Sequence, residues 1–237
     1  VKQCIGTFLD ISDRKAYEAR IETQNAILKG INRIFKRSLN CLTESEIGST
    51  CLEVAEELTE STMGFIGYID DDGEIHEISW SAQCRKSCWL GDQYGHGEFP
   101  DRFEIRNLYG RVLLDGKALF TNDPQRHPDS IGFPRGHPAI HSFLGVPLIH
   151  ETNKVGIIAL ANRPGGYRQH DLEKLEKLAP TIAHVIARLW MQRKMRESEE
   201  KFSKAFHNSP SFMLISEFED GTIIEVNDAY CQLTGYS

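Results

Sequence analysis

The sequence reads Gly136-His-Pro-Ala-Ile-His-Ser-Phe-Leu-Gly-Val-Pro-Leu148 at the point that decides its fold. In the second half of this stretch apolar residues alternate, which predicts a strand over residues 142–149 with one apolar face. Asn153-Lys154 then turns the chain, and every residue from 155 to 161 is apolar. A run that is apolar on both faces is typical of a strand in the middle of a sheet. These residues therefore predict a central strand over 155–161.

A helix and a pair of strands are predicted on the N-terminal side of this region. Thr43-Glu-Ser-Glu46 matches a capping box, so we expect a helix from there to about residue 60. Its buried face carries apolar residues spaced 4, 3 and 4 apart: Ile47, Cys51, Val54 and Leu58. Strands are expected over residues 64–69 and 74–80, joined by a tight turn. Alternation in the second strand places three side chains on one face: His76, Ile78 and Trp80.

The remaining elements include two helices with apolar seams. We expect a helix over residues 103–114, a short strand over 117–121, and a loop over 122–140 that is too long to be a mere connector. A long helix should run from about Gln169 past Met195. Apolar residues recur at heptad-like spacing in two helical stretches. The first seam consists of Tyr17, Ile21, Leu28, Ile31 and Phe35, and the second of Leu175, Leu178, Ile182, Val185 and Leu189.

Composition and charge narrow the classes of function. The chain has 27 Lys and Arg against 34 Asp and Glu, and no basic stripe interrupts this acidic balance, which argues against a nucleic-acid partner. The longest apolar stretch, residues 155–161, is far too short to cross a bilayer, so we expect no membrane contact for this part of the protein. Six scattered cysteines are typical of reduced thiols, which favours a cytoplasmic location.

Several motifs along the chain occur together in one known family. They are the 136–148 string, Trp80-Ser81, Gly110-Arg-Val112, Asn122-Asp-Pro124, Gly156–Asn162, and Tyr167 followed by Asp171-Leu172. In order and spacing they resemble a GAF domain over residues 41–190. The resemblance implies an α+β fold, in which an antiparallel sheet carries helices on one face and a pocket formed by loops on the other, with long N- and C-terminal linker helices. It also implies a cytosolic sensor, often attached to a histidine kinase or a cyclase.

Both ends of the chain resemble pieces of a second family. Gly6–Lys15 is similar to the last strand and exit of a PAS domain, with a strand over residues 5–11, and Asn227–Ser237 is similar to the early part of another. We therefore expect five segments: the end of a PAS domain (1–15), a linker helix (16–40), the GAF domain (41–190), a second linker helix (191–201), and the truncated start of another PAS domain (202–237).

This layout indicates a slice of a multi-domain signalling protein. The resemblance points to a sensor histidine kinase of a two-component system, with its catalytic domain outside this chain. The chain carries no P-loop, no kinase signature and no Ser-His-Asp order, so we expect no enzyme in this part. Residues after about 202 should be poorly packed or paired with a neighbour, because their domain is incomplete.

Six residues are candidates for contacts with a ligand in the pocket: Trp80, Cys88, Asn122, Asp123, His137 and Asn162. Trp80 could stack on a planar ligand or fill the core. Asn122 and Asp123 could line the rim of the pocket or cap their own loop. His137 could face a ligand or a metal, or bond to a neighbouring carbonyl. Asn162 ends the predicted central strand, where it would line the same pocket.

Two cysteines form a further candidate pair. Cys84 and Cys88 are four residues apart, a weak zinc signature because no second pair follows, and inert structural thiols are the alternative. GAF domains of this type often carry a cysteine a few residues after the tryptophan, which favours Cys88 as the pocket residue. A thiol together with His96 or His137 would suit haem iron, so haem stays open and the ligand unidentified.

Three functions are open on this pattern, and we favour the first. The chain could bind a small molecule or cofactor and relay a conformational change through a parallel dimer of its linker helices, over residues 17–39 and 172–195. It could instead be a ligand-free dimerisation and relay module whose pocket is filled by side chains. Alternatively, Cys84 and Cys88 could be the nucleophile and resolving thiol of a free methionine sulfoxide reductase, an activity known on the GAF fold.

Overall fold

The computed structural model describes residues 12–39, 43–70, 72–87, 102–133 and 137–235. The chain divides into two compact units, one reaching to Ala187 and one beginning at Arg188. The predicted strand over residues 5–11 lies outside the described residues. Each unit is described by itself.

The first unit is built on a six-stranded antiparallel sheet with the strand order β3-β2-β1-β6-β5-β4. The strands are β1 (Met63–Ile69), β2 (Ile75–Trp80), β3 (Arg102–Phe103), β4 (Leu119–Thr121), β5 (Phe143–His150) and β6 (Asn153–Ala161). β6 pairs with β1 on one side and β5 on the other, so the prediction of a central strand from its doubly apolar sequence is confirmed. The predicted antiparallel sheet is confirmed as well.

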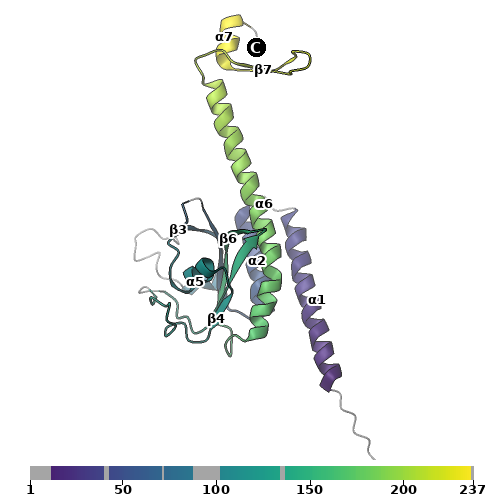
Figure 1. The fold of residues 1–237 in the computed structure, drawn as a ribbon, viewed down its shortest axis with the longest axis vertical. Helices are drawn as coiled ribbons and strands as arrows, with labels where there is room; N and C mark the ends of the chain where they lie inside the picture. Colours follow the sequence, from purple (N-terminus) through teal and green to yellow (C-terminus); the bar gives the residue numbers. More distant parts are fainter. Residues whose placement is uncertain (1–11, 40–42, 71, 88–101, 134–136, 236–237) are drawn as a thin grey trace, which may run out of the picture. The chain divides into compact units, whose positions relative to one another are not determined.

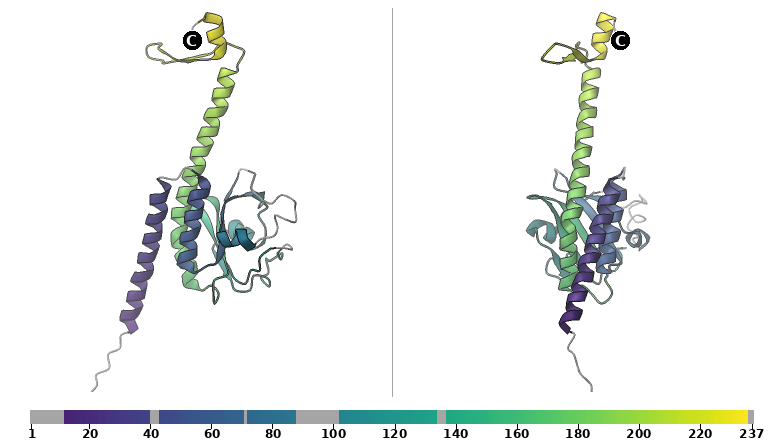
Figure 2. Two further views of the ribbon diagram at one scale, coloured as in Figure 1. Left: turned by 180° about the vertical axis from the view of Figure 1, so that it is seen from behind. Right: turned by 90° about the vertical axis from the view of Figure 1, so that its right-hand side faces the viewer.

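Helices cover one face of this sheet, and a short helix lies on the other (Figures 1 and 2). On the first face are α2 (Glu44–Thr59) and the beginning of α6 (Gln169–His207), with α1 (Ser12–Ser38) outside them. On the second face is α5 (Asn107–Asp115), while α3 (Ala82–Ser87) follows β2 directly. α2 begins as predicted, because the Thr43 hydroxyl accepts a hydrogen bond from the Glu46 backbone N–H at 3.3 Å.

The two apolar seams differ in how far their side chains are buried. In the second seam Leu175, Leu178, Ile182 and Val185 are buried inside the first unit. Up to Val185, the heptad-like spacing over 172–195 therefore marks the face of α6 that packs inside its own domain. Only the part of this segment after Val185 can contact a second chain through the predicted seam. In the first seam, on α1, four side chains are exposed: Tyr17 (66%), Ile21 (39%), Leu28 (56%) and Phe35 (42%).

A different face of α1 packs on α2. Ile27, Gly30 and Ile34 are the buried residues of α1. A Cβ at Gly30 would lie 2.6 Å from Cγ1 of Val54, so the absence of a side chain permits the close approach of the two helices. Arg33 adds ion pairs to Glu53 and Glu57 on α2, at 2.6 and 2.9 Å. α1 thus docks on its own domain without using its heptad seam.

The pairing of β1 with β2 contains an irregularity that the sequence does not reveal. The register shifts between Ile66 and Gly67, so that Trp80 lies opposite Phe65. Ile78 lies against α2 instead, where a Cβ at Gly48 would be 2.5 Å from its Cγ2. The prediction that His76, Ile78 and Trp80 share one face is therefore wrong for Trp80, because a β-bulge reverses the alternation within β2.

The start of α5 also differs from prediction. Arg102 and Phe103 pair with β2 as the short strand β3, and the helix begins only at Asn107. The helix ends at Gly116, which adopts φ 64° and so takes the left-handed conformation that favours glycine.

The second unit contains the end of α6, the two-stranded antiparallel sheet of β7 (Leu214–Ser216) and β8 (Ile223–Val226), and α7 (Asp228–Thr234). Asn227 is fully buried, and its amide nitrogen donates to the carbonyls of Phe206 and Ser211. Its amide oxygen accepts from the backbone N–H of Met213. Large apolar side chains nevertheless remain exposed in this unit: Phe212, Met213, Leu214, Phe218, Ile223, Ile224 and Leu233. This exposure agrees with the weak packing expected after residue 202.

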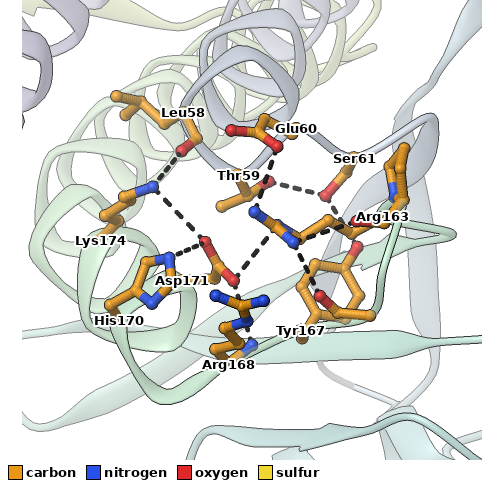
Figure 3. A network of polar contacts seen from close by, with 12 residues as sticks. Leu58, Thr59, Glu60, Ser61, Arg163, Tyr167, Arg168, His170, Asp171 and Lys174 are labelled. Carbon is orange, nitrogen blue, oxygen red and sulfur yellow. Dashed lines mark hydrogen bonds and ion pairs between the residues drawn. The ribbon is translucent and has the colours of Figure 1, made fainter.

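A polar network ties three segments of the first unit together (Figure 3). The side chain of Asp171 is fully buried in the first turn of α6, and its Oδ2 accepts from the Arg168 backbone N–H at 3.0 Å. Arg163, just after β6, places its Nε 3.3 Å from that carboxylate and its Nη2 3.1 Å from Glu60. Lys174 lies 3.4 Å from Asp171 and donates to the Leu58 carbonyl at 3.0 Å. The end of α2, the turn after β6 and the start of α6 are thereby locked together.

We predict that Asp171→Ala lowers the free energy of unfolding of the first unit by about 3 kcal/mol, because it leaves Arg163 and Lys174 without their buried counter-charge. Urea unfolding followed by circular dichroism measures this. Glu18→Ala, which removes an exposed ion pair to Arg14, is the matched control and should change stability by less than about 1 kcal/mol. Equal effects of the two substitutions would contradict the account of the network.

Candidate ligand pocket

A pocket of about 480 Å³ lies between the sheet and α5, within the size range of ligand-binding sites. Apolar side chains from β1, β5 and β6 form its floor, and residues 131–133 and 137–140 of the long loop contribute to its wall. Rings dominate the lining among the described residues: Phe65, Trp80, Tyr109, Phe133, His137 and Phe143.

The rings form two contacting groups. Phe65 packs against Trp80 with ring centroids 5.0 Å apart, and it meets Tyr109 edge-on at 6.1 Å. Phe133 stacks on His137 with centroids 4.9 Å apart. Such aromatic walls present flat apolar surface to a bound molecule. Trp80 and His137, two of the predicted site residues, thus line the same cavity.

The side chain of His137 is held by a hydrogen bond to the backbone. Its Nδ1 lies 2.7 Å from the Pro138 carbonyl oxygen, which accepts a hydrogen bond from the protonated Nδ1. Burial lowers the pKa of His137 below its usual value, and the hydrogen bond to Pro138 opposes this only in part. His137 therefore bonds to a neighbouring carbonyl and also lines the pocket, while its contact with a ligand or a metal stays a prediction.

The pocket thiol among the described residues is Cys84. It lies on α3, is buried, and its Sγ is 3.6 Å from the Gly64 carbonyl oxygen. Ser81 holds the start of α3 in place, since its hydroxyl accepts from the backbone N–H groups of Cys84 and Gly64, both at 3.2 Å. Cys88, the cysteine favoured from the sequence, lies outside the described residues.

Asn122 and Asp123 do not line the pocket. The Asn122 amide donates to the Tyr167 carbonyl at 2.9 Å and accepts from the Tyr167 N–H at 2.7 Å. A Cβ at Gly166 would lie 2.7 Å from Oδ1 of Asn122, so this close pairing needs glycine. Asp123 donates its backbone N–H to the Thr121 hydroxyl. The Asn122 amide therefore holds the distant turn at Tyr167 and not its own loop, and in the contact at Asp123 the capping side chain is that of Thr121.

Asn162 fastens the wall of the pocket without lining it. Its amide donates to the Ala139 carbonyl at 2.8 Å and accepts from the His141 N–H at 2.7 Å. The residue adopts φ 60°, a left-handed conformation that asparagine tolerates better than most residues. Asn162 therefore holds in place the loop segment that carries Pro138 and Ile140 into the lining.

Several lining residues were not among the sequence candidates: Phe65, Arg106, Asn107, Tyr109, Phe133 and Phe143. Asn107 holds the opposite part of the wall, because its amide donates to the Gly132 carbonyl at 3.1 Å while the residue adopts φ 64°. The sequence offered one signal, because the aromatic Tyr109 directly precedes the Gly110-Arg-Val112 motif.

A carboxyl group lies beneath the pocket on the helix side of the sheet. Burial raises the pKa of Glu56, on α2, to about 7, a hydrogen bond with the Ser81 hydroxyl lowers it, and the neighbouring Glu53 raises it further. The charge of Glu56 in turn contributes to the raised pKa of the Tyr167 phenol.

Comparison with known proteins agrees with this geometry. The family model described as "GAF domain" matches residues 41–187, which is more than half of the chain. The chain belongs to the GAF domain family. A second model, described as "PAS domain", matches residues 200–237. None of the helices in the described ranges is both long enough and apolar enough to span a membrane.

Individual relatives are distant. The chain is 23% identical over 230 residues to the "Methyl sulfide methyltransferase-associated sensor" of Methanosarcina acetivorans, a match that covers 96% of this chain and 22% of that protein. The chain thus spans less than a quarter of the length of this relative.

Among solved structures, the GAF domain of a phosphoenolpyruvate-protein phosphotransferase from Coxiella burnetii has a TM-score of 0.58 at 18% identity, covering 71% of this chain and 96% of that one. The free methionine-R-sulfoxide reductase of Neisseria meningitidis, in complex with its substrate, has a TM-score of 0.52 at 14% identity, covering 68% and 88%. At these identities the likeness shows the shared fold.

We predict that the stability of the domain falls as pH rises from about 5 to 8, in part through Glu56. The folded state raises the pKa of this carboxyl, so it binds the proton more tightly than the unfolded chain, and folding loses that advantage as Glu56 ionises. At pH 8, Glu56→Gln should be more stable than the wild type by about 1–2 kcal/mol, after allowance for solvent screening at this half-buried site.

Urea unfolding at both pH values measures the difference, which should shrink at pH 5. Glu173→Gln, at an exposed position of α6, controls for the change in net charge. An unchanged pH profile in Glu56→Gln would refute the link between Glu56 and stability.

Proposed function

We propose that this chain is the sensory module of a signal-transduction protein, which binds a small molecule or cofactor and relays a conformational change through its helices. The observation that carries the proposal is the ring-lined pocket of about 480 Å³ between the sheet and α5. A pocket with apolar walls and few polar groups is the usual form of a small-molecule site. The membership in the GAF family and the sensor name of the Methanosarcina relative support the same reading.

Continuous packing offers a route from the pocket to the N-terminal helix. Trp80 lines the pocket, whereas Ile78, two residues earlier in β2, lies against Gly48 of α2. α2 in turn contacts α1 where Val54 meets Gly30. A ligand that displaces Trp80 would therefore shift the surface on which α2 and α1 pack. Such a relay requires that the ligand bind one arrangement of these helices better than another.

The proposal extends to the full-length protein that contains this chain. We infer a cytoplasmic sensor histidine kinase of a two-component system, whose catalytic domain lies outside this chain. The segments are a PAS end (1–15), a linker helix (16–40), the GAF domain (41–190), a second linker helix (191–201) and a PAS start (202–237). The PAS match over residues 200–237 and the sensor-named relative support this layout.

The pocket residues proposed to contact the ligand are Trp80 and His137, with Cys84 as the nearby thiol. Cys88 stays a candidate from the sequence alone. A thiol and an imidazole on one cavity wall suit haem iron as well as other ligands. Asn122, Asp123 and Asn162 are instead proposed to shape the loops around the site, through the backbone contacts described above.

A reductase is the second candidate, because Cys84 lies on the wall of the pocket. In this reading Cys84 would take up the sulfoxide oxygen, which releases methionine and leaves a sulfenic acid on Cys84. Cys88 would then attack that sulfur, releasing water and forming a disulfide that the dithiol reductant reduces. An assay of free methionine sulfoxide reduction with a dithiol reductant separates the two functions. Turnover that disappears in Cys84→Ser would establish the reductase, and its absence in the wild type would leave the sensor.

We predict that the protein carries a bound small molecule when it is purified from the cells in which it is naturally expressed. Native mass spectrometry should show added mass, and an absorption spectrum with a Soret band would identify the molecule as haem. Trp80→Ala should weaken ligand affinity by roughly two- to tenfold, because stacking on an aromatic ring contributes about 0.5–1.5 kcal/mol.

Trp190→Ala serves as the control, since this tryptophan contacts Lys194 within α6 and does not line the pocket. Protein without added mass from every preparation would favour the ligand-free relay module instead.

We also predict a dimer through the exposed seam of α1. Leu28→Glu should convert it to a monomer in light scattering, because a charge would be buried at a heptad core position. Asn25→Glu, at an exposed position of the same helix outside the seam, should leave the dimer intact. A wild-type chain that stays monomeric at high concentration would refute the dimer.

A further inference from the structure

One charged side chain contributes to the pocket among the described lining residues, and it is Arg106. It is 62% exposed, so it lies at the open end of the cavity. The other lining residues carry apolar and aromatic groups, the Asn107 amide and the imidazole of His137. The described lining is therefore apolar inside and cationic at its entrance.

The guanidinium of Arg106 is weakly engaged by its carboxylate neighbour. Glu104 lies 3.4 Å away, but the two side chains are 62% and 72% exposed. Ion pairs this exposed contribute about 0–1 kcal/mol, so an incoming anion replaces Glu104 at little cost. Arg106 precedes α5 in an extended conformation and makes no side-chain capping bond to that helix.

Tyr109 places a second polar group beside Arg106. Its phenol lines the pocket, and burial raises its pKa while a hydrogen bond from Arg106 lowers it. The Arg106 guanidinium and the Tyr109 hydroxyl therefore lie within hydrogen-bond reach of each other. A guanidinium offers paired N–H donors in the geometry that suits a carboxylate.

We propose that the pocket binds a flat, largely apolar molecule that carries one acidic group, and that Arg106 binds this group at the entrance. The inference rests on the proposed ligand-binding function and adds the chemical class of the ligand. The rings of Phe65, Trp80 and Phe133 take the flat body. No carboxylate belongs to the described lining.

The test compares two probes of nearly the same shape, 2-naphthoate and its neutral amide, 2-naphthamide, by titration calorimetry on ligand-free chain. We expect the wild type to bind 2-naphthoate at least tenfold more tightly. Arg106→Gln should remove this preference and leave the affinity for 2-naphthamide unchanged, which also reports that the pocket is intact. Arg106→Lys should keep part of the preference, because it retains the charge and loses the paired donors.

Arg111→Gln is the matched control. Arg111 lies on α5, pairs with Asp115 at 2.9 Å, and is not among the residues that line the pocket. It should leave both affinities unchanged. Equal affinities of the wild type for the two probes, or a preference for 2-naphthoate that survives in Arg106→Gln, would overturn this inference while ligand binding stands. Failure of both probes to bind the wild type would count against this inference and the proposed function together.

Discussion

The register shift in the pairing of β1 with β2 is the constraint on which the rest of the structure depends. Without it, alternation would place Ile78 and Trp80 on the same side of β2. With it, Trp80 meets Phe65 on the pocket face, and Ile78 packs against Gly48 on the helix face. One strand thereby connects the aromatic wall of the pocket to the helices. This connection is the physical basis of the proposed relay.

Charge is separated between the two faces of the sheet. The helix face holds the buried Asp171, its cationic partners and the carboxyl of Glu56, while the described pocket lining holds a single cation at its entrance. The network around Asp171 fixes the ends of α2 and α6, so the side that supports the pocket is rigid. The loop walls are held more locally, by the side-chain amides of Asn107 and Asn162.

Much of the fold could be read from the sequence, and the site could be read only in part. The N-cap at Thr43, the doubly apolar β6 and the start of α6 are local signals, and each is confirmed. The bulge in β2 and the roles of Asn122 and Asn162 depend on partners distant in sequence, which spacing cannot reveal. The seam on α6 shows a related ambiguity, because heptad-like spacing is shared by helices that face a second chain and helices that face their own sheet.

A crystal structure of the chain isolated from cells that express it naturally would test the central claim most directly. We expect electron density for a non-protein molecule between Trp80 and His137, with an acidic group near Arg106. A cavity closed by the chain's own side chains, with Trp80 packed into the core, would contradict it.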